Sequence, residues 1–309
     1  MTTETSPPPE APPKARGPRI AIAFGIVVAV IVIYVLSLLA VHLLAQSAPA
    51  LPAVDFSKIE ADDTVVEVRL EKLDTVANRL TVNVLVYPKD SLYDKNLGTL
   101  TTDATVRLYP ENDLGDLQFP VGKAPAQVST AIIAHGDPGN WPFDSYSTDE
   151  ISADVFTGTA PNREKVPARV EVTGKLDGWD ATVTRVHDPA DPPDVQDNVK
   201  LTLSRSKGPL IFDFGICLVL IALPVLALWV AIPMALGRTT FLPPFGTWYA
   251  GMLFAVMPLR NFLPGSPPPG SWVDQALVLW VLVVLVAAMT IFIFAWWRFR
   301  DRKKPPKKA

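Results

Sequence analysis

The chain has 309 residues, of which 49% are hydrophobic and 19% charged, and its formal net charge is −3. The apolar residues form blocks near the two ends, whereas residues 46–209 carry 26 acidic and 16 basic side chains. Such an acidic middle region would be repelled by phosphates, which argues against nucleic-acid binding. The single cysteine, Cys217, excludes an internal disulfide, a cysteine-based zinc site and paired-thiol redox chemistry.

The N-terminal region predicts a tail followed by a membrane anchor. Residues 1–19 are rich in proline and charge, so they cannot bury a core and we expect them to be disordered. Residues 20–45 form an apolar run that is longer than the roughly 20 residues needed to cross hydrocarbon. The run is also too long for the apolar part of a signal peptide, so an uncleaved anchor is expected. Lys14, Arg16 and Arg19 precede it and predict a cytoplasmic N-terminus.

Residues 46–209 predict an extracytoplasmic all-β domain. Eight short stretches, such as RLTVNVLVY and ARVEVTGKL, alternate apolar and polar residues and are rich in β-branched side chains. Clusters of turn-forming residues, such as PENDLGD and HGDPGN, separate them. This spacing is typical of a β-sandwich, and it leaves an immunoglobulin-like or jelly-roll-like topology open.

The C-terminal third predicts three further membrane helices. Residues 210–235 and 273–297 are strongly apolar, and residues 241–259 are less so. Counting 241–259 as a span makes residues 260–272 an outer loop and places the basic tail, 298–309, in the cytoplasm. The expected fold is therefore a mixed membrane protein with about four transmembrane helices, one before and three after the β domain, and with both termini cytoplasmic.

The sequence offers little catalytic chemistry. It contains no phosphate-binding glycine loop, no nucleophile elbow and no zinc-protease motif. The histidines His42, His135 and His187 are scattered, and the aspartate-rich segment 187–197 lacks the glycine and terminal glutamate of a calcium loop. We therefore expect no catalytic residue, no cofactor and no metal ion.

A loop in the β domain combines large apolar residues with one carboxylate: Trp141, Pro142, Phe143, Asp144 and Tyr146. Exposed aromatic side chains in an aqueous loop cost free energy unless another surface covers them. The sequence leaves two interpretations open. The loop is either a corner of the domain that packs into its own core, or a surface that docks on the membrane helices or on a partner.

The predicted outer loop carries Arg260, a basic residue on the side of the membrane that usually lacks them. A charge at that edge is best tolerated when it is paired. Asp274, Asp213 and Asp144 are all expected near the same membrane face. Our hypothesis is that Arg260 pairs with one of these carboxylates and fastens the β domain to the helices.

These two loops carry a family resemblance. The motif Trp-Pro-Phe-Asp-Ser-Tyr at 141–146 and the loop from Arg260 to Asp274, between an N-terminal anchor and a C-terminal helical region, resemble the actinobacterial membrane family DUF4436. The resemblance covers nearly all of the chain after the tail. It implies this architecture and a bacterial inner membrane of the mycobacterial type, but no established activity.

A local resemblance also links residues 141–144 to the Phe-Pro-Phe-Asp loop of pentameric ligand-gated channels, which sits where a β-sandwich meets the membrane. The span order differs, and no pore-lining polar stripe is visible in residues 210–297. We expect a non-enzymatic accessory, scaffold or sensor subunit of the cell envelope. It would contact the lipid bilayer and either a protein partner or further copies of itself. The alternatives are a component of a small-molecule or lipid transporter and a membrane-bound envelope enzyme.

Overall fold

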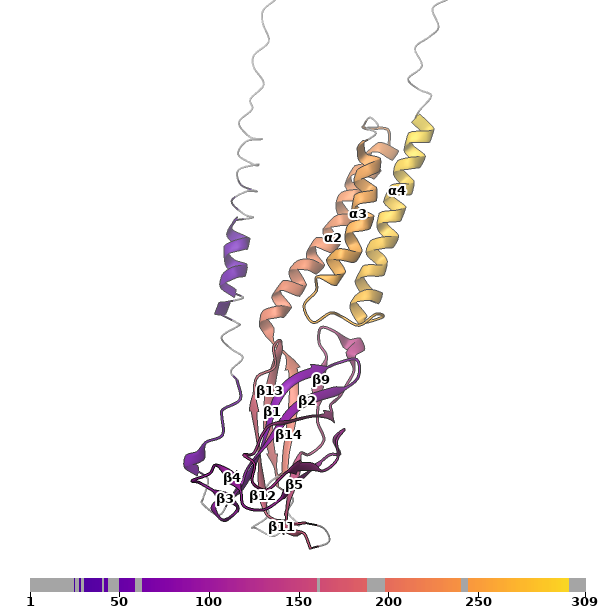
Figure 1. The fold of residues 1–309 in the computed structure, drawn as a ribbon. Coiled ribbons are helices and arrows are strands. Elements are labelled where there is room, and N and C mark those ends of the chain that lie inside the picture. Colours follow the sequence, from indigo (N-terminus) through magenta and orange to yellow (C-terminus); the bar gives the residue numbers. More distant parts are fainter. Residues whose placement is uncertain are drawn as a thin grey trace, which may run out of the picture.

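The computed structural model describes residues 25, 28, 31–40, 42–43, 50–58, 63–159, 162–187, 198–239 and 244–299. The predicted tail at 1–19, most of the aspartate-rich segment and the residues after Phe299 lie outside this part. Figure 1 shows a β-rich domain with three helices standing on one of its ends. The described part of the first apolar run includes a short helix, Ile31–Ala40, drawn to one side of the three.

The β domain contains three four-stranded sheets and one short two-stranded sheet. The first sheet has the strand order β12 (Ala168–Gly174), β1 (Thr64–Asp74), β2 (Arg79–Tyr87), β7 (Val128–Ile133). The second has the order β11 (Glu164–Val166), β10 (Ser152–Thr157), β5 (Ala104–Tyr109), β6 (Leu117–Phe119). The third has the order β13 (Trp179–Val186), β14 (Asn198–Arg205), β9 (Ser145–Ser147), β8 (His135–Gly136).

The short sheet pairs β3 (Tyr93–Asp94) with β4 (Thr99–Leu100). Three 3₁₀ turns complete the described domain: η1 (Phe56–Lys58), η2 (Asp90–Leu92) and η3 (Pro138–Asn140). Most strand pairs are antiparallel, but β1 and β12 run parallel with Thr64 opposite Ala168 and Leu70 opposite Gly174. This pairing brings together segments about a hundred residues apart, which local alternation cannot reveal.

One apolar core fills the β domain, and period-two alternation builds it. In β2, every second residue from Leu80 to Val86 is buried, while the residues between them are half-exposed. In β14, Val199, Leu201 and Leu203 are fully buried and belong to the same core. Side chains alternate between the two faces of a strand, so this pattern requires one covered face. The predicted β-rich domain is confirmed.

The helical region consists of α2 (Lys207–Ala235), α3 (Pro244–Asn261) and α4 (Leu279–Phe299), and a π-helical turn, η4 (Asp274–Val278), leads into α4. Two of the described helices, Lys207–Ala235 and Asp274–Phe299, are long and apolar enough to cross a membrane. α3 and Ile31–Ala40 do not meet that criterion, because α3 contains several polar residues and the first helix is short. By this measure the described chain supports two spanning helices rather than the four that the sequence predicts.

Small residues allow the three helices to pack closely. Ala227 and Ala231 of α2 and Ala288 of α4 are fully buried, and all three belong to a second apolar core distinct from that of the β domain. Tyr249 of α3 is also buried there, and its hydroxyl donates a hydrogen bond of 2.9 Å to the carbonyl oxygen of Ala227. α3 is therefore part of the bundle even though it is the least apolar of the three helices.

Candidate functional site

The predicted aromatic loop lies where the β domain meets the helices, and its residues divide between the two cores. Trp141 is 1% exposed and belongs to the helical core, together with Leu220 of α2 and Leu263 of the loop after α3. Tyr146 belongs to the core of the β domain, where its ring meets Trp179 edge-on at 5.3 Å. The geometry thus favours docking on the helices for Trp141 and packing within the domain for Tyr146.

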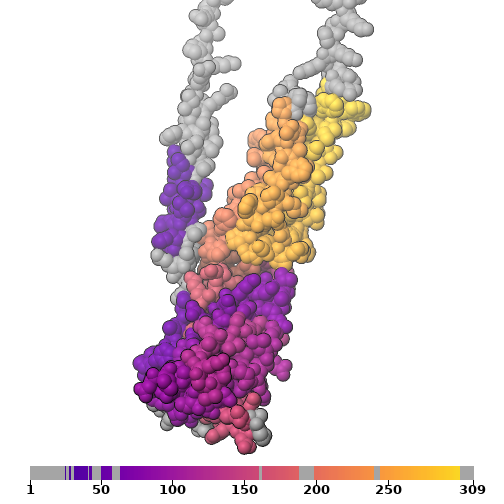
Figure 2. Space-filling view, in the orientation of Figure 1, coloured from indigo at the N-terminus to yellow at the C-terminus, as the bar shows by residue number. Residues whose placement is uncertain are grey.

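Pro142 and Phe143 lie between Trp141 and Asp144 in the same loop. Phe143 is 64% exposed, and its ring centroid lies 6.4 Å from that of Phe214 on α2. Pro142 connects it to Trp141 and is buried as well. Figure 2 shows the violet and magenta surface of the β domain in direct contact with the orange and yellow surface of the helices. Trp141 and Pro142 therefore lie within the contact between the two parts, and Phe143 lies exposed beside α2.

The central interaction of this junction is an ion pair between Asp144 and Arg205. Arg205 is the last residue of β14, and Ser206 alone separates it from α2. Its Nε and Nη2 atoms donate to the two carboxylate oxygens of Asp144, the second hydrogen bond being 3.0 Å long. The Asp144 side chain is 0% exposed and that of Arg205 is 10% exposed. A bidentate pair of this kind satisfies both buried charges at once.

Two tryptophan rings and a glycine enclose the guanidinium of Arg205. Its central carbon lies 4.7 Å from the ring centroid of Trp179 and 5.8 Å from that of Trp141, which are cation–π distances. Gly265, in the loop after α3, approaches so closely that a Cβ atom there would collide with Nη1 of Arg205. Its φ of +75° also favours glycine. Three segments distant in the sequence thus meet at one side chain.

The sequence analysis did not identify Arg205. The signal was available, because Arg205 lies a few residues before an apolar block, at the same predicted membrane edge as Arg260. Only Arg260, the basic residue of the predicted outer loop, was expected to pair with a carboxylate. The principle that an interfacial charge needs a partner applied equally to both residues.

Arg260 does pair with one of the three carboxylates proposed for it, namely Asp274. Its Nε and Nη2 atoms donate to the carboxylate at 2.9 and 2.7 Å, and Nη2 also donates to the carbonyl oxygens of Pro267 and Pro268 at 2.8 and 3.3 Å. All these partners belong to the loop itself or to the helix that follows it. The pair therefore closes the loop between α3 and α4, while the same loop meets the β domain where Gly265 lies against Arg205.

The remaining predicted carboxylate, Asp213, lies on the first turns of α2. It is 3% exposed, and its Oδ1 atom has no hydrogen-bond partner among the described residues. The guanidinium of Arg205 interacts with it electrostatically. The junction thus holds two carboxylates around one guanidinium, of which Asp144 takes all the direct hydrogen bonds that we observe.

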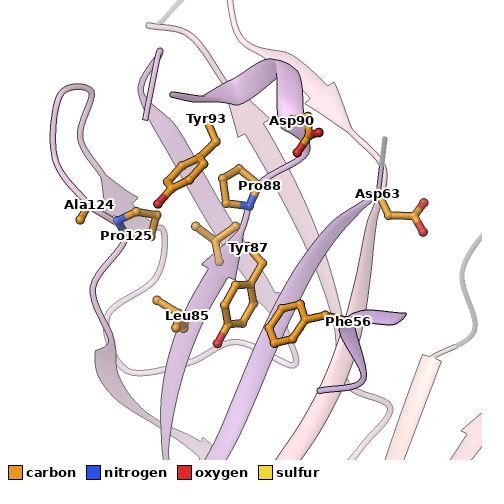
Figure 3. Close-up of a pocket in the computed structure, with 10 residues that line it drawn as sticks. Phe56, Asp63, Leu85, Tyr87, Pro88, Asp90, Tyr93, Ala124 and Pro125 are labelled. Carbon is orange, nitrogen blue, oxygen red and sulfur yellow. The ribbon is translucent and has the colours of Figure 1, made fainter. Parts of the chain in front are cut away.

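A hollow of about 410 Å³ lies in the β domain at the end away from the helices (Figures 1 and 3). Its walls come from η1, the end of β2, the following turn and the segment before β7. The lining residues are mostly aromatic rings, prolines and aliphatic side chains, with two carboxylates: Phe56, Asp63, Leu85, Val86, Tyr87, Pro88, Asp90, Tyr93, Ala124 and Pro125. Sequence reasoning missed this site, although two tyrosines in the segment from Tyr87 to Tyr93 were a signal.

Hydrogen bonds hold one wall of this hollow in place. The Tyr87 hydroxyl donates to Oε2 of Glu67 at 2.9 Å, and Thr173 donates to the other carboxylate oxygen at 2.6 Å. Burial, and then the hydrogen bond to Glu67, raise the pKa of Tyr87 to about 12, so its hydroxyl stays neutral at physiological pH. The ring of Phe56 meets that of Tyr87 edge-on at 5.0 Å. The aromatic surface is therefore formed before any ligand binds.

Neither place carries an evident catalytic set. The residues that line the hollow include no histidine, cysteine or serine. Nε2 of His135 lies 3.2 Å from Asp149, but both side chains are more than half exposed. Among the described residues, no group of three or more His, Cys, Asp or Glu side chains is arranged to hold a metal ion.

The buried pair generates a first prediction. Asp144→Ala should lower the apparent melting temperature of the purified protein strongly, because Arg205 is left buried without its counter-charge, at a cost of about 3–5 kcal/mol. Asp113→Ala is the matched control, since it breaks an ion pair with Arg79 whose side chains are 43% and 48% exposed, at a cost of about 0–1 kcal/mol. Thermal unfolding in mild detergent compares them. Equal shifts would contradict a central role for the pair.

The loop between α3 and α4 generates a second prediction. Arg260→Glu should destabilise the protein by roughly 2–3 kcal/mol, because it sets a carboxylate against Asp274 and removes the donor to two proline carbonyls. The swap Arg260→Glu with Asp274→Arg should recover part of the loss. Arg298→Glu, at an exposed position at the other end of the helix that follows Asp274, is the control. If Arg298→Glu lowers the melting temperature as much as Arg260→Glu does, the ion pair between Arg260 and Asp274 does not stabilise the protein more than an exposed charge does.

Comparison with known families divides the chain at this junction. Residues 54–203 match the family described as "Domain of unknown function (DUF4436)", and residues 205–299 match a second one, "Domain of unknown function (DUF8686)". The resemblance to DUF4436 thus covers the β domain, whereas the Arg260–Asp274 loop falls in the second match. No curated protein matches the chain. The match to DUF4436 that the sequence predicted is therefore confirmed for the β domain, over residues 54–203.

Proposed function

We propose that this chain is a non-enzymatic membrane protein that presents its β domain as a binding module outside the cytoplasmic membrane. It would act as an accessory, scaffold or sensor subunit of the cell envelope. The observation that carries the proposal is the buried junction of Trp141, Asp144 and Arg205. A domain attached by a flexible linker needs no such contact, whereas a domain that must hold a fixed position above the membrane does.

Four membrane spans complete this proposal, at residues 20–45, 210–235, 241–259 and 273–297, with both termini in the cytoplasm. Two of them correspond to the long apolar helices. Packing supports the crossing by α3, because Tyr249 bonds to α2 and the loop after α3 returns to Arg205. Its 18 residues span about 27 Å at 1.5 Å per residue, close to the thickness of the hydrocarbon core. Helix Ile31–Ala40 lies within the remaining span.

The binding site in this proposal is the aromatic hollow. Its volume lies within the range of known ligand pockets, and its mostly apolar lining with a few polar groups at the edge is typical of them. It also lies at the end of the domain that points away from the helices, where an exported ligand or partner has access. A role as an accessory subunit therefore accounts for both ends of the β domain. One end is attached to the helices, and the other presents the aromatic hollow to a ligand or partner.

The topology is tested by cysteine labelling, for which the chain offers a simple background. Cys217→Ser removes its only thiol. Single cysteines are then introduced by Leu97→Cys, at a highly exposed position of the β domain, and by Ala309→Cys at the C-terminus. We expect a membrane-impermeant maleimide to label only Leu97→Cys in intact cells, and both variants after lysis. Labelling of Ala309→Cys in intact cells would contradict four spans.

The binding role is tested by photo-crosslinking in native membranes. A photoreactive amino acid replaces Tyr93, at the edge of the hollow, or Tyr109, an exposed tyrosine outside it. We expect a defined protein adduct from position 93 and none from position 109. Adducts with lipid alone would favour the transporter alternative instead. If neither position gives an adduct, the hollow is not a partner site.

A further inference from the structure

A second hollow lies on the helices, at the end away from the β domain. Its volume is about 600 Å³, and its lining has an apolar part and a polar part. The apolar part consists of Trp229, Val230, Pro233, Met234 and Phe245 from α2 and α3. The polar part consists of Arg238 and Thr239, which follow the end of α2. A hollow with these two parts matches an amphipathic ligand.

The electrostatics at this end favour an anion. Arg238 is the only charged residue among the described residues of the lining, and the described residues 225–239, 244–255 and 290–299 contain no aspartate or glutamate. α3 begins here, so the free N–H groups of its first turn add partial positive charge. The C-terminus of α2 carries partial negative charge, which would repel an anion. This charge is reduced because the N–H groups of Leu236, Gly237 and Arg238 donate hydrogen bonds to carbonyl oxygens of the last turn of α2. The polar part is therefore suited to a phosphate group.

The apolar part suits a hydrocarbon chain. Trp229 is 78% exposed, and Phe245 is half-buried on α3, with its ring centroid 5.8 Å from that of Trp248. Tryptophan is enriched where a membrane meets water, because one end of its ring system is apolar and the other polar. A soluble anion such as free phosphate would leave this surface uncovered. A lipid would cover it while its headgroup reaches Arg238.

We propose that this hollow binds one anionic phospholipid of the cytoplasmic leaflet. The phosphate would accept hydrogen bonds from the Arg238 guanidinium and the Thr239 hydroxyl, and one acyl chain would lie along Trp229 and Met234. Basic pockets between membrane helices on the cytoplasmic side bind anionic headgroups in this way. The proposal rests on the membrane orientation given above, since that orientation places Arg238 at the cytoplasmic face.

The test measures lipid retention by the purified full-length chain. The protein is delipidated in mild detergent, incubated with phosphatidylglycerol or phosphatidylcholine, and analysed by native mass spectrometry. We expect the parent to retain phosphatidylglycerol preferentially and Arg238→Gln to lower this retention about fivefold. Arg238→Lys should keep most of it. Arg298→Gln, which removes an exposed charge near the same end but outside the lining, should change it little.

Three outcomes would overturn the proposal. Equal losses of phosphatidylglycerol retention in Arg238→Gln and Arg298→Gln would mean that the positive charge at this end of the helices attracts anionic lipid without a defined binding site. Equal retention of the two lipids by the parent would exclude recognition of the headgroup charge. Displacement of the lipid by millimolar inorganic phosphate would identify a phosphate site instead. Lipid retention in detergent and cysteine labelling in cells are separate measurements, so failure of this site is distinguishable from failure of the proposed topology.

Discussion

The structure depends on one buried ion pair, between Arg205 at the end of the last strand and Asp144 in the loop before β9. Bringing both groups out of water costs several kcal/mol each, and their attraction repays this only when geometry and further contacts are favourable. Here two hydrogen bonds, two tryptophan rings and the close approach of Gly265 supply those contacts. Of these contacts, the close approach of Gly265 comes from the helical region, so the surroundings of the pair are complete only when the loop after α3 lies against the β domain.

The path of the chain also attaches the β domain to the helices. β14 is hydrogen-bonded on both sides, to β13 and β9, and it continues into α2 after Ser206 alone. The direction of α2 is thus tied to a central strand of the domain, with little room for a hinge. Trp141, in the loop before β9, packs into the helical core. Two independent attachments, one covalent and one by packing, fix the domain against the helices.

The sequence allowed prediction of what local pattern controls. The alternation in β2 and β14 indicated buried strands, and the aromatic residues around Asp144 indicated a surface that must be covered. Two features depended on contacts between distant segments and could not be predicted in this way. The partner of Asp144 is about sixty residues away, and the hollow is assembled from four separate segments. Arg260 illustrates this limit. Its partner, Asp274, was among the three predicted carboxylates. The pair was expected to fasten the β domain to the helices, whereas it closes the loop between α3 and α4.

Strand β2 connects the two ends of the β domain. At one end, the turn between β1 and β2 contains Thr75, whose carbonyl oxygen accepts a hydrogen bond of 3.5 Å from Tyr146, two residues from Asp144. At the other end, Tyr87 forms a wall of the aromatic hollow. The eight steps from Arg79 to Tyr87 span roughly 26 Å. Since β2 is central in its sheet and buries every second side chain, it cannot shift without disturbing the core. β2 is therefore one rigid element that both ends of the domain share, and it fixes the separation between the hollow and the loop that carries Asp144.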